Sequence, residues 1–208
     1  MNFEHITERV DQYYSDKIMT HGATARGVDW NSLESQNLRF EKLLQVCNFQ
    51  TPYSINDYGC GYGALVDSLR IKGIPFGYRG FDLSQAMLTQ ARGLYPGLEC
   101  DFTHEESGLR IADYTVASGI FNVKLQASDE EWKEYMAATV DKLANFSAKG
   151  FAFNVLTLYS DAERRRPDLY YADPLYWFDT CKRKYSRYVS LLHDYPLYEF
   201  TILVQKVP

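Results

Sequence analysis

Cysteine is scarce in this chain and gives no sign of a metal centre. The four cysteines, Cys47, Cys60, Cys100 and Cys181, lie far apart, and none forms the C-x-x-C pair that is typical of a zinc site. We therefore expect no bound metal. Cysteines scattered in this way are common in reducing compartments, which favours a cytoplasmic protein.

Long apolar runs and an excess of positive charge are also missing. No run approaches the roughly 20 apolar residues that cross a bilayer, and the N-terminal stretch MNFEHITERVDQYY lacks the apolar core of a signal peptide. The 22 lysines and arginines are outnumbered by 27 aspartates and glutamates, so the formal net charge is −5. Nucleic acids bind to basic surfaces, so we expect no nucleic-acid partner. Because no apolar run could cross a bilayer, we expect no membrane partner either.

Internal repeats and low-complexity linkers are absent, and 208 residues fit a single domain, residues 1–208. Aromatic residues, by contrast, are abundant. The chain has 17 tyrosines and 12 phenylalanines, and its aromatic share is 15%. These rings either form a tyrosine-rich core and surface or line a ligand pocket.

Helix-like and strand-like segments alternate along most of the chain. Helical patterns are expected at residues 2–16, 33–47, 64–73, 84–96, 129–147 and 174–185, and strands at 53–59, 76–83, 98–102, 114–123, 149–157 and, as a hairpin, 187–206. Strands separated by helices pair in parallel through right-handed crossovers, whereas a tight turn forces antiparallel pairing. The pattern predicts an α/β fold with a doubly wound, mostly parallel sheet and a C-terminal antiparallel hairpin.

The stretch INDYGCGYGAL, residues 55–65, ends the first expected strand with three alternating glycines. Gly59, Gly61 and Gly63 can adopt positive φ and let a ligand approach the backbone. One glycine usually suffices for a plain strand-to-helix turn, and open α/β sheets bind ligands beyond the carboxyl ends of their strands. We therefore expect a ligand site at this loop.

Two classes of ligand compete for the glycine loop. Gly59, Gly61 and Ala64 satisfy the G-x-G-x-x-G/A pattern of dinucleotide sites. Asp57, at the loop entrance, would repel a pyrophosphate and would attract a cation. S-adenosylmethionine carries a sulfonium and an ammonium group, so the carboxylate favours it over a dinucleotide.

The same stretches resemble the motifs of class I S-adenosylmethionine-dependent methyltransferases. DYGCGYG is similar to their first motif, an acidic residue followed by G-x-G-x-G, and GFDLSQAML to the second, whose acid is here Asp82. CDF resembles the third motif, and ASGIFN, residues 117–122, resembles the loop after the fourth strand. The resemblance implies a seven-stranded sheet whose last strand is reversed, with an N-terminal helical cap at 1–38, a Rossmann-like core at 39–208 and an acceptor-side insertion at about 159–175.

The resemblance also implies which residues contact the cofactor. They are Asp57, Tyr58, Gly59, Cys60, Gly61, Gly63, Asp82, Leu83, Met87, Asp101, Phe102, Ser118, Gly119, Ile120 and Phe121. In this assignment Asp82 holds both ribose hydroxyls, Asp101 accepts from the adenine amino group, and the 118–121 loop runs along the methionine part. The alternatives are a helix cap for Asp82, a solvated turn for Asp101 and a plain strand end for the loop.

The resemblance further implies that the N-terminal segment folds over the cofactor and that the insertion faces the acceptor. Tyr13, Tyr14, Trp30, Tyr159 and Arg164 are then candidates for substrate binding. Trp30 could equally fasten its loop to the core, and Arg164 could belong to a solvated run of charge.

Methyl transfer is a direct displacement, so position contributes more than any fixed catalytic group. His21, in the expected lid, is the candidate base, although a lone histidine is usually structural or solvated. The prediction is a methyltransferase that acts on a small molecule and releases S-adenosylhomocysteine. A nicotinamide-dependent oxidoreductase and a non-catalytic cofactor-binding module remain as alternatives.

Overall fold

The centre of the molecule is a seven-stranded sheet with the order β3-β2-β1-β4-β5-β7-β6. The computed structural model describes residues 3–97 and 99–206. The strands are β1 (Tyr53–Tyr58), β2 (Phe76–Phe81), β3 (Cys100–Thr103), β4 (Ala112–Ala117), β5 (Ser147–Leu156), β6 (Tyr188–Leu192) and β7 (Glu199–Gln205). The first five strands pair in parallel, whereas β7 is antiparallel to both β5 and β6, which confirms the predicted sheet and its C-terminal hairpin.

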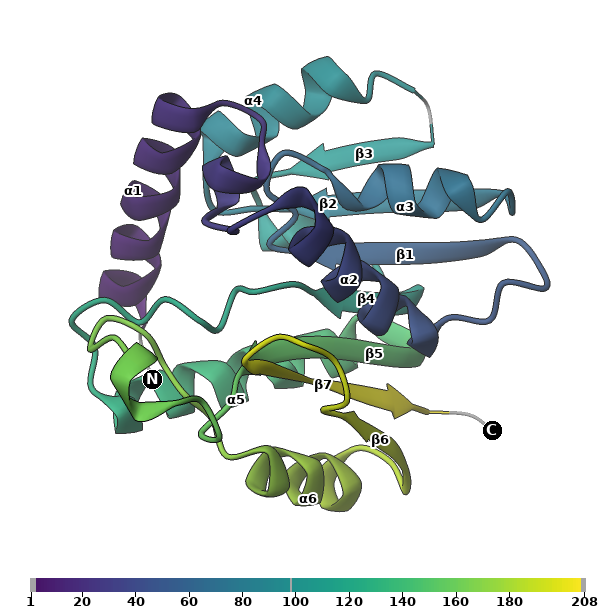
Figure 1. Ribbon diagram of the computed structural model, residues 1–208. Helices are drawn as coiled ribbons and strands as arrows, with labels where there is room; N and C mark the ends of the chain where they lie inside the picture. The colour runs from purple at the N-terminus through teal and green to yellow at the C-terminus, as the bar shows by residue number, and fades with distance from the viewer. Residues whose placement is uncertain (1–2, 98, 207–208) are drawn as a thin grey trace.

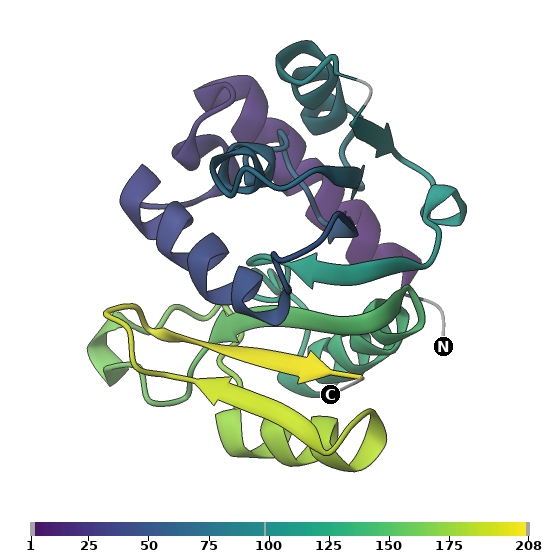
Figure 2. The same cartoon turned by 90° about the vertical axis from the view of Figure 1, so that its right-hand side faces the viewer.

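Helices connect the strands and cover the sheet (Figure 1). They are α1 (Glu4–His21), α2 (Leu33–Leu43), α3 (Leu65–Ile71), α4 (Gln85–Leu94), α5 (Asp129–Asn145) and α6 (Pro174–Lys184), with 3-10 turns η1 (Ala25–Val28), η2 (Leu44–Val46), η3 (Glu106–Gly108) and η4 (Ala162–Arg164). Figure 2 shows β6 and β7 side by side at the lower edge of the sheet, with α6 beneath them.

Each face of the sheet has its own apolar cluster because successive side chains of a strand point to opposite faces. On one face, Phe151 and Phe153 of β5 pack with Trp132 of α5 and Trp177 of α6. On the other face, Ile55 of β1 packs in a cluster with buried residues of α2, α3 and α4. The two clusters cover the two faces of the sheet with buried side chains, so a ligand site is expected at the carboxyl ends of the strands.

The N-terminal segment lies across those carboxyl ends. In Figure 1, α1 stands beside the sheet on the side to which the β3 arrow points. Its residue Ile18 is buried with Tyr62 of the glycine loop and Met87 of α4, so the helix is packed onto the core. This is the place expected for a cap over a bound ligand.

The element bounds differ from the sequence expectations most at the first helix and at the fourth strand, whose pattern was expected over 114–123 and which ends at Ala117. Helix α1 continues to His21, and residues 25–28 form a 3-10 turn in a stretch where neither a helix nor a strand was expected. The predicted boundary between cap and core at residue 38 falls inside α2. The expected ranges that include residues 1, 2, 98, 207 or 208 reach outside the described residues there.

Among the described residues, no helix is long and apolar enough to cross a membrane.

Candidate functional site

A pocket opens at the carboxyl ends of β1, β2 and β4, beneath the N-terminal cap. It encloses about 850 Å³, including the part open to solvent. Its walls are Val10, Asp11, Tyr14, Val28, Trp30, Gln36, Phe40, Asp57, Tyr58, Gly59, Cys60, Gly61, Tyr62, Ala64, Phe81, Asp82, Leu83, Met87, Ser118, Gly119, Ile120 and Tyr135. The pocket therefore lies where the glycine loop and the second motif were expected to meet.

The glycine loop has no room for side chains on its pocket side. Gly59 has a φ of 81°, and a Cβ there would lie 2.2 Å from Ile120. Gly61 has a φ of 55°, and its Cβ would lie 2.9 Å from Val28 of the cap. Both the backbone conformation and the close neighbours thus require glycine.

Gly63 serves a different purpose from the other two glycines. Its φ is 84°, and a Cβ there would lie 3.0–3.2 Å from the rings of Tyr95 and Phe102. Phe102 is buried in the cluster beneath the loop and does not line the pocket. Gly63 and Phe102, both expected to contact the cofactor, therefore support the loop from below.

Asp57 is a buried carboxyl at the end of β1. Its side chain is only 3% exposed, and its Oδ2 accepts a hydrogen bond of 2.8 Å from the hydroxyl of Tyr78. Burial raises the pKa of Asp57 to about 7, against the opposing effect of the Tyr78 hydrogen bond. The group is therefore poised to ionise when a positive charge enters the pocket.

Asp82 connects the second strand to the glycine loop. Its Oδ2 accepts from the Gly61 amide at 2.7 Å, and its Oδ1 accepts from the Ser84 amide at 2.9 Å. Burial raises the pKa of Asp82 to about 6, although both amide hydrogen bonds oppose the shift. Each carboxyl oxygen can accept a further hydrogen bond, so the side chain is oriented and still able to bind a ligand.

A third carboxyl reaches the pocket from the cap. Asp11 of α1 lines the pocket, and its Oδ1 accepts a hydrogen bond of 2.9 Å from Ser15. Ser15 in turn lies 2.7 Å from the hydroxyl of Ser84, which caps α4, so the helix is fastened beside Asp82. No described lining residue is a lysine, arginine or histidine. No group of three His, Cys, Asp or Glu side chains that could hold a metal ion occurs in residues 3–97 and 99–206.

The loop after β4 forms the remaining wall. The Gly119 amide donates to Asn154 Oδ1 at 2.8 Å, and Trp132 Nε1 donates to the Phe121 carbonyl at 2.9 Å. Ser118 Oγ is buried and has no hydrogen-bond partner in the described structure. The loop is thus held rigidly from behind and keeps one hydroxyl for a polar atom of a ligand.

The pocket brings together most of the residues expected to contact a cofactor and some of those expected to bind a substrate. Those that line it are Asp57, Tyr58, Gly59, Cys60, Gly61, Asp82, Leu83, Met87, Ser118, Gly119, Ile120, Tyr14 and Trp30. Those that do not are Gly63, Asp101, Phe102, Phe121, Tyr13, Tyr159, Arg164 and His21.

The residues outside the pocket have other neighbours. Asp101 is 65% exposed and pairs with Arg79 at 3.1 Å, and the Tyr13 hydroxyl donates to Asp29 at 2.8 Å. His21 ends α1 and is exposed, as are Tyr159 and Arg164. Their predicted roles therefore stay predictions, without support from the position of these side chains.

Several lining residues were not recognised in the sequence. Val10 and Asp11 recur at helical spacing with the predicted Tyr14 on α1, and that period could have placed them on the same face. Tyr135 of α5 and Phe40 of α2 carry no comparable signal. They reach the pocket through the tertiary packing of helices that belong to opposite faces of the sheet.

Comparison with known proteins agrees with this architecture. No protein-family model matches the chain. Over 164 residues the chain is 52% identical to the putative methyltransferase Rv1506c of Mycobacterium tuberculosis (strain ATCC 25618 / H37Rv), a match that covers 78% of this chain and 99% of that protein.

Solved methyltransferase structures share the fold at low sequence identity. The DhpI–SAM–HEP complex matches with a TM-score of 0.65 at 13% identity, over 98% of this chain and 99% of that chain. Magnesium protoporphyrin IX methyltransferase (ChlM) from Synechocystis PCC 6803 with bound SAH matches with a TM-score of 0.61 at 14% identity, over 84% and 83%. With the relationship given by the mycobacterial protein and the fold by the solved structures, the chain belongs to the class I S-adenosylmethionine-dependent methyltransferases.

Proposed function

We propose that this methyltransferase binds S-adenosylmethionine in the pocket at the glycine loop and methylates a small-molecule acceptor. The charge of the pocket carries the proposal. Asp11, Asp57 and Asp82 present carboxyl groups to it, and no described lining residue is cationic. A ligand with fixed positive charge stabilises the ionised carboxylates, and S-adenosylmethionine carries a sulfonium and an ammonium group.

The shape and polarity of the walls fit the same ligand. Asp82 offers two oriented oxygens, which suit two neighbouring ribose hydroxyls. Ser118 Oγ offers a further polar contact from the opposite wall, where we place the methionine part. Gly59 and Gly61 allow the ligand to approach the backbone between these walls.

When bound, S-adenosylmethionine supplies a methyl group on a sulfonium sulfur that an acceptor takes by in-line displacement. The chain's own contribution is to orient both molecules and to exclude water from the space beneath the cap. His21 is exposed at the end of α1, away from the pocket walls. The proposal therefore gives the role of general base to no residue, because position alone can support such a displacement.

The walls of the pocket and the charge of the chain support a small acceptor. Most of the lining side chains are apolar or aromatic, and a few carboxyl groups converge among them, as is usual for small-molecule sites. The net charge of −5 disfavours nucleic acid as the substrate. The proposal includes a cytoplasmic location, which the four unpaired cysteines favour.

The two alternatives differ from the proposal in the ligand that binds or in the reaction that follows. A nicotinamide dinucleotide would place its pyrophosphate beside Asp57, without a described cationic wall residue to offset the repulsion. A non-catalytic module would bind S-adenosylmethionine but transfer no methyl group. Binding of S-adenosylmethionine without binding of NAD or NADP would exclude the first alternative. Methyl transfer to an acceptor would exclude the second.

The test is isothermal titration calorimetry with S-adenosylmethionine, S-adenosylhomocysteine, NAD and NADP, followed by a screen of small acceptors that detects S-adenosylhomocysteine release. We expect micromolar binding of the two sulfur nucleosides alone, and turnover with at least one acceptor. Binding of a dinucleotide instead would overturn the proposed cofactor. Cofactor binding without turnover on any acceptor would favour the non-catalytic module.

A further inference from the structure

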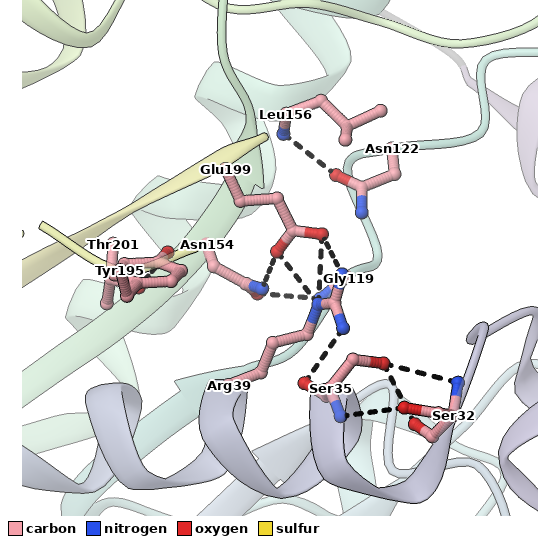
Figure 3. Close-up of polar contacts among 10 residues, drawn as sticks. All are labelled: Ser32, Ser35, Arg39, Gly119, Asn122, Asn154, Leu156, Tyr195, Glu199 and Thr201. Atoms are coloured by element: carbon pink, nitrogen blue, oxygen red, sulfur yellow. Dashed lines mark hydrogen bonds and ion pairs between the residues drawn. The ribbon is translucent and has the colours of Figure 1, made fainter. Parts of the chain in front are cut away.

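A buried ion pair joins α2 to β7, near the far end of the chain. Arg39 of α2 and Glu199 of β7 are 6% and 1% exposed, and 160 positions separate them in the sequence. Arg39 Nε lies 2.9 Å from both carboxylate oxygens, and Nη2 lies 2.5 Å from Oε1 (Figure 3). The carboxylate is thus held in one orientation by several charge-assisted hydrogen bonds.

Glu199 connects this ion pair to the pocket loop. Asn154 Nδ2 donates to Glu199 Oε2 at 2.6 Å, and Asn154 Oδ1 accepts from the Gly119 amide at 2.8 Å (Figure 3). Because one end of the amide meets a carboxylate and the other an N–H, only one orientation of Asn154 satisfies both. A displacement of Glu199 would therefore be transmitted to the backbone of Gly119.

Arg39 also holds Trp30. The guanidinium carbon lies 3.8 Å from the centroid of the Trp30 ring, in a cation–π contact. Arg39 Nη1 donates to the Ser35 carbonyl at 2.8 Å, which fixes the side chain along α2. The capping box of Ser32 and Ser35 starts α2 directly after the Trp30 segment and defines where that segment leaves the helix.

A contact between Trp30 and Gly119 completes this series of contacts at the pocket. A Cβ on Gly119 would lie 2.2 Å from two carbons of the Trp30 indole, so the ring lies directly against the Gly119 backbone. Trp30, Arg39, Glu199, Asn154 and Gly119 form a closed series of contacts, which we call the five-residue circuit. Two of its members, Trp30 and Gly119, are pocket walls.

Stability alone does not account for the buried charges. A buried ion pair is often no more stabilising than apolar side chains of the same volume, because both charges lose their hydration. Unlike apolar residues, the ion pair fixes the direction of the Arg39 guanidinium over the Trp30 ring. It also fixes the orientation of the Asn154 amide beneath Gly119.

We propose that Arg39 and Glu199 are positioning residues that hold Trp30 against the 118–121 loop and thereby set the shape of the pocket for its ligand. The inference rests on the proposed function only in the identity of that ligand. Neither Arg39 nor Glu199 lines the pocket, so both act through Trp30 and Gly119.

The first test needs no ligand. The chain has three tryptophans, and Trp132 and Trp177 are 0% and 1% exposed, so acrylamide quenching of the wild-type fluorescence reports mainly on Trp30. Arg39→Met/Glu199→Met removes both charges together and leaves no unpaired buried ion. We expect a clear rise in the quenching constant in this double variant, and no rise when Trp30→Phe is also present. An unchanged quenching constant would overturn the proposal.

The second test is a thermodynamic cycle on S-adenosylhomocysteine affinity, measured by calorimetry. We expect Arg39→Met/Glu199→Met to weaken binding about tenfold, the order of one desolvated cation–π contact. In a Trp30→Ala background the same pair of changes should weaken binding by much less than tenfold, because only the route through Asn154 and Gly119 then remains. Full additivity of the two effects, or unchanged affinity with Trp30 present, would overturn the proposal.

A matched control separates this role from general damage to β7. Thr201 is fully buried two residues after Glu199, and its hydroxyl pairs with that of Tyr195 at 2.9 Å (Figure 3). Thr201→Val removes this hydrogen bond near the circuit, and it should leave both the quenching and the affinity within twofold of wild type. If wild-type protein does not bind S-adenosylhomocysteine, the proposed function fails, and the quenching experiment still decides the circuit.

Discussion

Trp30 lies directly against the α-carbon of Gly119, so close that a methyl group on that carbon would be 2.2 Å from the indole carbons Cζ2 and Cη2. The two residues belong to the cap and to the loop after β4, and both line the pocket. Gly119 also has a φ of 74°, which disfavours any side chain. Contact between cap and core at this point therefore depends on glycine for two separate reasons.

Substitution of Gly119 separates those two reasons. Gly119→Ala should lower the free energy of unfolding by more than Gly73→Ala, because Gly73 has a similar φ of 69° but open space around its α-carbon. Gly73→Ala measures backbone strain alone, about 1–3 kcal/mol. Thermal and chemical denaturation of the two variants gives the difference.

The clash with Trp30 can be removed in turn. In a Trp30→Ala background, the cost of Gly119→Ala should fall to that of Gly73→Ala, since only the strain remains. Equal costs of the two glycine substitutions in the wild-type background would show that the indole moves away freely.

Asp82 provides the most direct test of the cofactor site. Asp82→Asn keeps the acceptor oxygen that Ser84 uses and removes the charge. We expect S-adenosylhomocysteine to bind roughly 10- to 100-fold more weakly, the range for loss of charge-assisted hydrogen bonds of about 1.5–3 kcal/mol. Calorimetry against Asp179→Asn, a change on an exposed part of α6, provides the comparison, and affinities within twofold of each other would contradict the assignment.

Asp101 is expected to matter much less. Its side chain is 65% exposed, pairs with Arg79 and lies outside the pocket walls. Asp101→Asn should therefore change S-adenosylhomocysteine affinity by less than about twofold, since an exposed ion pair contributes little. A loss of tenfold or more, with Arg79→Gln unchanged, would instead support the adenine contact that the sequence motif implies.

The order of elements and the glycine loop could be predicted because they depend on local signals. Gly59 and Gly61 are required by positive φ and close packing at a strand end, and Asp82 follows the next strand at the same edge of the sheet. Parallel strands bring such ends together whatever the rest of the chain does.

The remaining features depend on contacts that no local pattern records. Arg39 and Glu199 meet across 160 positions, and Arg39 alone would be read as a solvated charge on α2. The insertion residues Tyr159 and Arg164 resemble a binding surface in sequence, yet they are exposed away from the pocket walls. Whether these side chains are buried or exposed depends on tertiary packing, which the local sequence and the composition do not reveal.

The two buried carboxyls make both the stability of the folded chain and its ligand binding dependent on pH. Burial raises the pKa of Asp57 from its ordinary value of 3.8 to about 7, and that of Asp82 to about 6. The folded chain therefore binds more protons than the unfolded chain between about pH 4 and pH 7. Over that window, these two groups make the folded state less stable as the pH rises.

A cationic ligand reverses the preference, because it favours the ionised carboxylates. We expect S-adenosylmethionine affinity to rise roughly ten- to thirtyfold from pH 5.5 to 7.5, because its sulfonium is positive throughout this range and its α-amino group is still largely protonated. Calorimetry across this range should show a shallower rise in Asp57→Asn, confined to pH values below about 6, because only Asp82 then titrates. The exposed-site variant Asp179→Asn should follow the wild-type profile. Because protonated carboxyls attract a cation only weakly, a flat wild-type profile would mean that the ionisation of neither buried carboxyl contributes to ligand binding.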